Sequence, residues 1–198
     1  MRAPAGRTRP VSRRRPVTAA VIAIAVAATA CSQSKNVTYT SAEQPYVDAL
    51  GKAMDAQAPG LGADDSRCIA GAFVRAIGVD RFRAKVKPDR IGADFDVASV
   101  SGASRSILTT AQAARFPGAA KACGSLQEAA SLFSLQEAKG IDPVRAAETL
   151  RCVSKRLNDR EAGVLAQYYL TRAPGTEELR AKTIATLTLK ACGVATSP

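Results

Sequence analysis

The sequence predicts an all-α protein, a helical bundle built from two cysteine-paired repeats that follow an N-terminal signal helix and a short tether. Three observations predict this fold. Apolar residues recur at helical spacing over most of residues 41–192. Gly, Pro and capping residues divide the same stretch into segments of helix length. Lys-Ala-Cys-Gly occurs twice, at 121–124 and 190–193, which indicates an internal repeat.

The first 30 residues have the three parts of an export signal. Six arginines and no acids precede an apolar run that starts at Val17, and small residues end the run just before Cys31. The run is shorter than the roughly 20 residues that span a bilayer. Ala28-Thr29-Ala30-Cys31 resembles a bacterial lipobox, although Ala28 stands where Leu is usual.

We therefore expect residues 1–30 to be a lipoprotein signal peptide and Cys31 to carry the lipid. This places the protein on the outer face of the cell membrane. The alternative is cleavage of the same bond by the ordinary signal peptidase, because Ala28 and Ala30 also suit that enzyme. In that case the protein is secreted and Cys31 is a free thiol.

The composition excludes several classes of function. The chain has no histidine and no tryptophan, which rules out Ser-His-Asp sites, Cys-His sites and histidine-ligated zinc. The net charge of +11 falls to +5 without the six signal arginines, because 22 bases then face 17 acids. These bases are scattered, so we expect no nucleic-acid partner. We also expect no metal and no cofactor.

The first half begins with a polar stretch and continues with helices. Residues 31–40 lack helical periodicity and predict a tether that holds the domain off the membrane. A first helix begins near Ser41, with Gln44 completing a capping box, and ends at 58–60. A second helix begins near Asp64 and ends at Gly78, and 79–85 add a short turn of helix.

The stretch 87–106 differs from the rest in having no sustained period. It contains Pro88, Gly92, Gly102 and several serines, which predict an irregular loop with a short strand pairing at 94–100. Long loops in compact domains often carry function, so this loop is a candidate partner-contact surface. The alternative is a variable surface insertion.

Five further helices follow, each with recognisable boundaries. Thr109 and Gln112 open the first of them, and Pro117 predicts a kink or a late start within it. Ser125 and Glu128 form a second capping pair, and Asp142 precedes Pro143 as a strong helix start. Residues 158–172 predict a further helix. Thr176 opens the last one, in which four residues align at helical spacing: Leu179, Thr183, Leu187 and Ala191.

The two halves share one order of features, which predicts repeats over 41–124 and 125–198. In each half a cysteine-bearing helix, at Cys68 or Cys152, comes before a helix that ends in Lys-Ala-Cys-Gly. A copied unit must satisfy its own cysteines, so the repeat selects the pairs Cys68–Cys123 and Cys152–Cys192. Four buried thiols are the alternative. A four-cysteine metal site is disfavoured, because the sequence has no C-x-x-C pair.

The run from Cys68 to Phe82, followed by a helix that ends in Cys123, resembles a module of uncharacterised exported actinobacterial proteins and lipoproteins. The likeness covers residues 64–124 more closely than 142–193. It implies an envelope location and an all-helical, disulfide-linked module. It implies no activity.

These observations lead to three hypotheses about function. The first is a non-catalytic envelope lipoprotein that binds or scaffolds an envelope protein or polymer. The second is a wall-active hydrolase that uses carboxylates alone, for which Asp94 and Asp96 in the irregular loop are the candidates. The acid pairs Asp64–Asp65 and Glu177–Glu178 lie where helix starts favour negative charge. The third is a carrier of a small apolar ligand.

Overall fold

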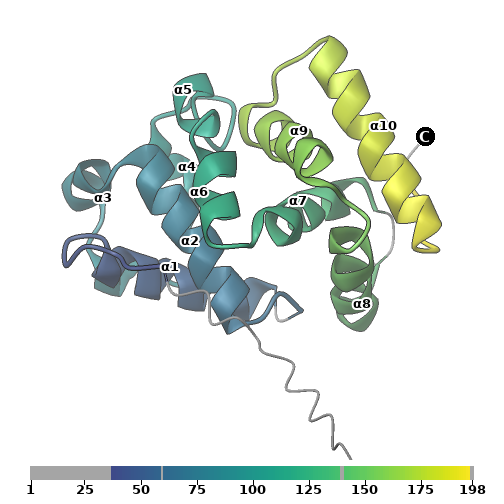
Figure 1. The fold of residues 1–198 in the computed structure, drawn as a ribbon. Coiled ribbons are helices and arrows are strands. Elements are labelled where there is room, and N and C mark those ends of the chain that lie inside the picture. The colour runs from purple at the N-terminus through teal and green to yellow at the C-terminus, as the bar shows by residue number, and fades with distance from the viewer. Residues whose placement is uncertain (1–36, 59, 139–140, 197–198) are drawn as a thin grey trace, which may run out of the picture. The chain divides into compact units, whose positions relative to one another are not determined.

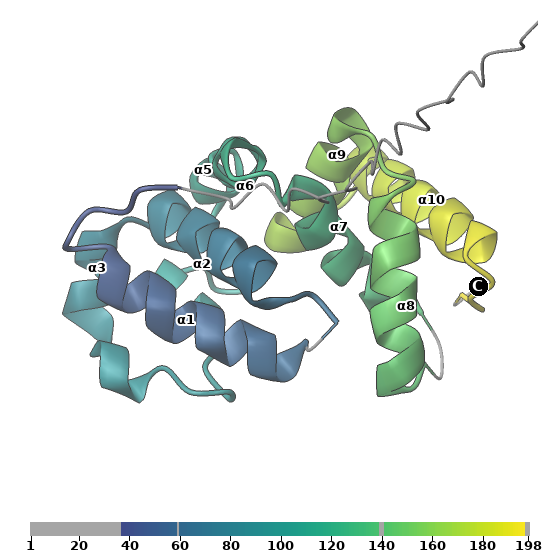
Figure 2. The same ribbon diagram turned by 60° about the horizontal axis from the view of Figure 1, so that its bottom comes forward.

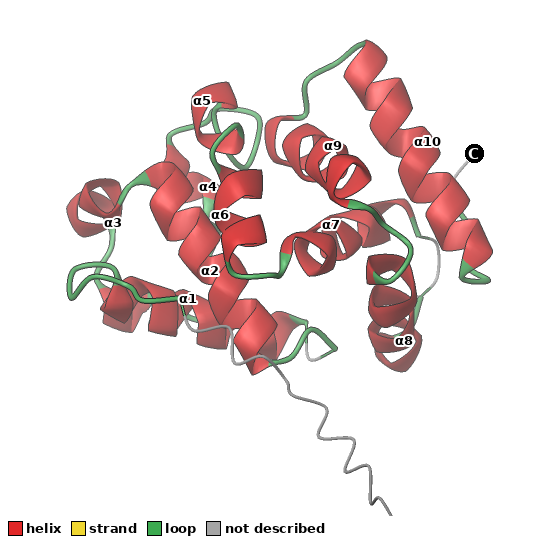
Figure 3. Ribbon diagram, in the orientation of Figure 1, coloured by secondary structure: helices red, strands yellow, loops and turns green. Residues whose placement is uncertain are grey.

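The computed structural model describes residues 37–58, 60–138 and 141–196. In these residues no strand forms, and the only pairing outside helices is an isolated bridge between Ala138 and Thr196 (Figure 3). The predicted all-α class is therefore confirmed. The predicted signal peptide, Cys31 and residues 31–36 of the predicted tether lie outside the described residues.

The first half contains two long helices and several short ones (Figure 1). The long helices, α1 and α2, pack along each other (Figure 2). The short helices follow them and close one side of α2. The bounds are α1 (Gln44–Gln57), α2 (Ala63–Ile77), α3 (Val79–Lys85), η1 (Pro88–Arg90), α4 (Ala98–Ser101), α5 (Thr110–Ala113) and α6 (Phe116–Ala122).

The second half is made of longer helices arranged around α7 and α9. Helix α7 packs against α8 and α9, and α10 packs against α9. The bounds are α7 (Leu126–Ser134), η2 (Leu135–Glu137), α8 (Pro143–Ser154), α9 (Asp159–Thr171) and α10 (Thr176–Ala191).

The two halves share one hydrophobic core. Phe116 contacts Phe73 in the first half, with ring centroids 4.8 Å apart, and Phe133 in the second half at 6.0 Å. The amide of Leu108 donates to the carbonyl of Leu170 at 2.9 Å. The described residues accordingly belong to one compact unit. The predicted boundary at 124/125 is therefore a boundary between two halves of one domain.

Three helix starts in the described chain are fixed by side-chain caps. Thr109 and Gln112 form the predicted capping box, which starts α5. The carboxylate of Asp142 accepts from the amides of Val144 and Arg145, as its position before Pro143 predicted. Asn158 caps α9 through a box with Glu161. The break between α5 and α6 falls before Phe116, so Pro117 lies in the first turn of α6, where a missing N–H costs little.

Three predicted caps are wrong. At α1 the reciprocal hydrogen bonds join Thr40 and Glu43, one residue before the Ser41–Gln44 pair. The hydroxyl of Ser125 donates to Asp65 at 2.6 Å and does not cap α7. Gly175 is the N-cap residue of α10, so Thr176 lies inside the helix.

The loop at 87–106 is irregular, as predicted, but the strand pairing predicted at 94–100 is wrong. Residues 88–90 form a single 3₁₀ turn, and residues 98–101 form the short helix α4. A carboxylate oxygen of Asp96 accepts from the amide of Ala98 at 2.9 Å, and this local hydrogen bond favours a helical turn over a strand.

The two Lys-Ala-Cys-Gly segments adopt the same local structure. Each cysteine is the C-cap residue that follows its helix, and Gly124 and Gly193 come next with φ of 72° and 74°. The amide two residues beyond each cysteine bonds back to the carbonyl of Ala120 or Leu189, which is a Schellman motif. A side chain is strained at this φ, which explains the glycine in both copies.

The cysteines lie in the predicted pairs at disulfide distance. The Cα atoms of Cys68 and Cys123 are 5.8 Å apart, and those of Cys152 and Cys192 are 6.0 Å apart. The first pair joins α2 to the end of α6, and the second joins α8 to the end of α10. Each pair therefore lies within one half.

Candidate functional site

Residues 37–40, the end of the predicted tether, pack on α2. We call the contact of Tyr39 with α2 the seat of Tyr39. Tyr39 lies against Gly71, where an added Cβ would overlap the tyrosine ring. The phenol oxygen of Tyr39 is 3.5 Å from the carbonyl of Arg67. Residues 37–40 are thus held on the domain, whereas the sequence predicted them to be part of the tether.

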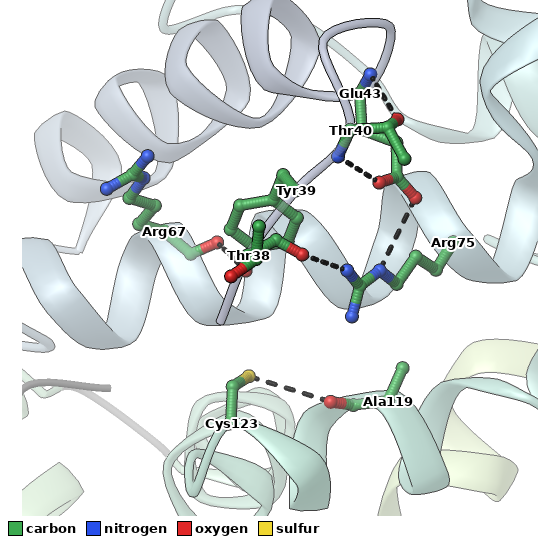
Figure 4. Close-up of polar contacts among 8 residues, drawn as sticks. All are labelled: Thr38, Tyr39, Thr40, Glu43, Arg67, Arg75, Ala119 and Cys123. Carbon is green, nitrogen blue, oxygen red and sulfur yellow. Dashed lines mark hydrogen bonds and ion pairs between the residues drawn. The ribbon is translucent and has the colours of Figure 1, made fainter. Parts of the chain in front are cut away.

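Two arginines flank this seat (Figure 4). Arg67 and Arg75 lie four residues on either side of Gly71, so all three share one stripe of α2. The guanidinium carbon of Arg75 is 4.9 Å from the centre of the Tyr39 ring, and that of Arg67 is 5.8 Å away. Arg75 also donates to the carbonyl of Thr38 at 2.8 Å. These contacts hold both the ring and the backbone of the segment.

Glu43 completes the seat at its far end. Its carboxylate accepts from the amide of Thr40 at 2.9 Å and from Arg75 at 3.4 Å. Burial would raise the pKa of Glu43, but the hydrogen bonds from Thr40 and the charge of Arg75 outweigh it and lower that pKa. Burial also raises the pKa of the Tyr39 phenol, an effect that Arg75 and Arg67 partly oppose. At neutral pH Glu43 is therefore an anion and Tyr39 is neutral.

Cys123, the partner of Cys68 on α2, follows the end of α6 and is drawn with Ala119 in Figure 4. The sulfur of Cys123 is 3.6 Å from the carbonyl oxygen of Ala119. A disulfide sulfur carries no proton, so this is a packing contact once Cys123 is joined to Cys68. The Cys68–Cys123 pair links the end of α6 to α2, the helix on which Tyr39 packs.

A cleft with a volume of about 310 Å³ lies where the two halves meet. Leu61 and Leu150 are almost fully buried in its lining. Asp65 and Glu128 are half-buried, whereas Arg151 and Lys155 are exposed. The cleft is lined by Gly60, Leu61, Asp65, Glu128, Ser131, Leu150, Arg151, Ser154 and Lys155.

The cleft is lined by charges of both signs. The carboxylates of Asp65 and Glu128 are half-buried, and the exposed bases Arg151 and Lys155 form what we call its rim. Ser131 and Ser154 add hydroxyl groups that can donate and accept. Such a lining suits a ligand that carries both an amino group and an acid group.

The predicted acid pairs lie in the irregular loop and in the first turns of α2 and α10. Asp94 and Asp96 are both exposed, and the carboxylate of Asp96 accepts from the amide of Ala98, the first residue of α4. Asp64 and Asp65 lie in the first turn of α2, where Asp65 accepts from Ser125. In α10 the carboxylate of Glu178 pairs with Lys182 at 2.8 Å. Glu177 lies beside it in the first turn.

The irregular loop lines a separate hollow of about 520 Å³. Arg105 comes from the loop itself and Arg172 from the end of α9. Arg172 is the one residue other than glycine with a positive φ in the described chain, at 53°. Its guanidinium stacks 5.1 Å from the ring of Tyr169 and donates to Gln136, so it is held by the domain.

No family model, curated protein or solved structure matches this chain. Its function must therefore be argued from its own residues. Among the described residues no helix is long and apolar enough to cross a membrane. The same residues contain no group of three or more Asp, Glu, Cys or His side chains suited to a metal ion.

Sequence reasoning missed the seat of Tyr39 and the role of Glu128 in the cleft. Tyr39 is a single aromatic residue in a polar stretch, which gives no periodic signal. The sequence signal that could indicate this contact lies on α2, where Arg67, Gly71 and Arg75 follow one another at intervals of four and so share one face. Glu128 follows Ser125 by three residues, a spacing that predicts a capping pair and gives no sign of a cleft.

Proposed function

We propose that this chain is a cell-envelope lipoprotein, held on the outer face of the membrane by a lipid on Cys31. Its helical domain is a non-catalytic module that binds or scaffolds another envelope component. The observation that carries this proposal is that the cysteines of the described residues lie in two pairs at disulfide distance. Disulfides persist in oxidising compartments outside the cytosol, which agrees with the export signal at 1–30.

The seat of Tyr39 supports a domain that stays close to the membrane. Tyr39 is eight residues beyond Cys31. Eight fully extended residues span at most about 29 Å. A lipid on Cys31 therefore keeps α2 within about that distance of the membrane surface, within reach of partners that are themselves in or on the membrane.

The cleft between the two halves is the surface we assign to partner binding. It is concave, it is lined from both halves, and it presents carboxylates and bases together. Polar groups placed in a concave site fix the orientation of a bound ligand. Its charges suit an envelope component with amino and acid groups, such as a peptide.

The anchor is tested by the intact mass of the protein purified from membranes. We expect cleavage before Cys31, the added mass of a diacylglycerol, and the loss of four hydrogens from the two cysteine pairs. Cys31→Ser should remove the lipid mass and move the protein from the membrane to the medium. A membrane-free native protein with reduced thiols would contradict the proposal.

The binding role is tested by a pull-down from membranes with the lipidated protein. Arg151→Glu combined with Lys155→Glu reverses the charge at the rim of the cleft and touches no core residue. We expect this variant to lose the partner that the native protein recovers. Arg83→Glu with Lys85→Glu on α3 is the matched control, since both residues are exposed and outside the cleft. Equal recovery with all three proteins would show that the cleft does not bind the partner.

A further inference from the structure

The outer face of α10 exposes large apolar side chains. Leu179 is 71% exposed and Leu187 is 63% exposed, two of the three large apolar residues in the described chain with this degree of exposure. They lie eight positions apart and about 80° apart around the helix, so they share one face. Thr183, also exposed, lies between them. This is the stripe that helical spacing identified in the sequence.

The buried side of α10 is built from other residues. Ala181, Ala185 and Leu189 are fully buried. They face the rest of the domain, where α10 packs on α9 (Figure 1). The helix thus meets the core with two alanines and one leucine and leaves two leucines outside. The core does not bury Leu179 or Leu187, so both side chains are available for contact with a partner.

The charges on the outer face are all positive. Arg180 and Lys190 lie next to the two leucines and are exposed. The acids of the helix, Glu177 and Glu178, lie on other sides of it, and Glu178 pairs with Lys182. A face that combines leucines with bases suits an anionic lipid surface, because the bases attract the headgroups and the leucines can enter the interface.

A groove of about 540 Å³ runs beside this face. Leu179 and Ile184 give it an apolar part, and Arg160 of α9 joins Arg180 as a second base. The carboxylate of Glu161, which also lines the groove, is used in the capping box of α9. The groove therefore combines apolar side chains with two bases, which suits a lipid with an anionic headgroup.

We propose that the outer face of α10 rests on an anionic lipid surface. The inference rests on the envelope location proposed above, which brings the domain within a short chain length of a membrane. Leu179 and Leu187 enter the interface, and Arg180 and Lys190 contact the headgroups.

A second copy of the chain is a poorer occupant. In a symmetric pair the same face would meet itself, so the bases of one copy would lie near the bases of the other. No acid on this face would offset them. An anionic lipid surface matches both the leucines and the bases.

The test uses residues 32–198, which contain the whole described domain with its single core and both cysteine pairs. Without Cys31 there is no anchor, so binding to vesicles reports on the domain alone. The probe is sedimentation with vesicles of phosphatidylcholine that contain about a quarter of phosphatidylglycerol, against phosphatidylcholine alone. We expect binding to the anionic vesicles only, and its loss at high salt.

Two double variants separate the contributions of charge and apolar contact. Arg180→Glu with Lys190→Glu should weaken binding by about 30-fold or more, since each base near the surface contributes about fivefold. Leu179→Ser with Leu187→Ser should weaken it by about tenfold. Arg83→Glu with Lys85→Glu on α3 is the matched control and should bind within about twofold of native. Circular dichroism checks that each variant is folded.

The outcomes separate this inference from the proposed function. Equal binding of native and α10 variants, or an equal loss in the α3 control, would overturn the role of α10. A dimer in sedimentation that Leu179→Ser with Leu187→Ser abolishes would assign the face to a second copy and also overturn it. Absence of lipid on Cys31 would contradict the anchor and leave the vesicle result unaffected.

Discussion

A substitution at Gly71 can test whether Tyr39 packs against α2 in solution. Replacing glycine by alanine within a helix normally stabilises a protein by about 1 kcal/mol. In the native chain we expect Gly71→Ala to give no such gain, because its Cβ displaces the ring of Tyr39. In a Tyr39→Ala background the Cβ has room, and the same substitution should stabilise by about 1 kcal/mol.

Urea unfolding of the four proteins in this cycle measures both effects. The difference between the two backgrounds is the coupling between the residues, and we expect at least 1 kcal/mol. A gain from Gly71→Ala that is equal in both backgrounds would mean that Tyr39 is not held against α2 in solution. Residues 37–40 would then belong to the tether.

Tyr169 links the stability of the second half to alkaline pH. Burial raises the pKa of its phenol, and the hydrogen bond that it donates to Glu137 at 2.8 Å raises it further. The unfolded chain loses this proton near pH 10, whereas the folded chain keeps it. The contribution of Tyr169 to stability is therefore complete below about pH 10 and is lost as the pH rises above that value.

Tyr169→Phe should make this pH dependence visible. We expect the variant to be about 1–2 kcal/mol less stable at pH 7, because Glu137 loses its donor. Between about pH 9.5 and pH 11.5 it should lose less stability than the native protein, because one ionisable group is gone. Unfolding by guanidinium at several pH values measures both quantities. An unchanged slope above pH 10 would contradict the buried environment of the phenol.

The starts of α9 and α10 offer two substitutions that compare a capping side chain with one that does not cap. Asn158 accepts from the amide of Glu161 at 2.9 Å, so Asn158→Ala should cost about 1 kcal/mol. Thr176 caps nothing, because it lies one residue inside α10. Thr176→Ala should therefore change the free energy of unfolding by less than about 0.5 kcal/mol. Thermal unfolding of both variants checks this, and equal losses would restore Thr176 as a cap.

The helices could be predicted from the sequence, whereas several of their contacts could not. Apolar spacing and breaker residues located the long helices, because these signals act within one turn or two. A cap also depends on backbone geometry. Thr109 has the extended conformation of a cap, with ψ of 159°, whereas Ser125 has ψ of 26° and bonds to Asp65, 60 residues away.

In the last helix, α10, the sequence did not predict which face is buried. Its apolar residues lie on two sides, so spacing alone does not say which side meets the core. Packing on α9 selects Ala181, Ala185 and Leu189 and leaves Leu179 and Leu187 outside. The cleft between the two halves could not be predicted either, because its lining residues come from both halves and are far apart in the sequence.

For the molecule as a whole, each cysteine pair lies within one half, whereas the hydrophobic core is shared by both halves. Each pair closes a loop within its own half, of 55 residues in the first and 40 in the second. The buried apolar residues of both halves nevertheless form one contiguous cluster. The described residues of both halves therefore form a single domain. We expect one unfolding transition.

The second cysteine pair tests this cooperativity. Cys152→Ser with Cys192→Ser frees a 40-residue loop, which should cost roughly 4 kcal/mol on the chain-entropy model. Native-state amide exchange then compares α9, which lies in the same half, with α2, which lies in the other. Because Phe116 contacts both Phe73 and Phe133, the slowest amides of both helices should lose the same protection. Native protection in α2 with a loss confined to α9 would instead mean that the halves unfold independently.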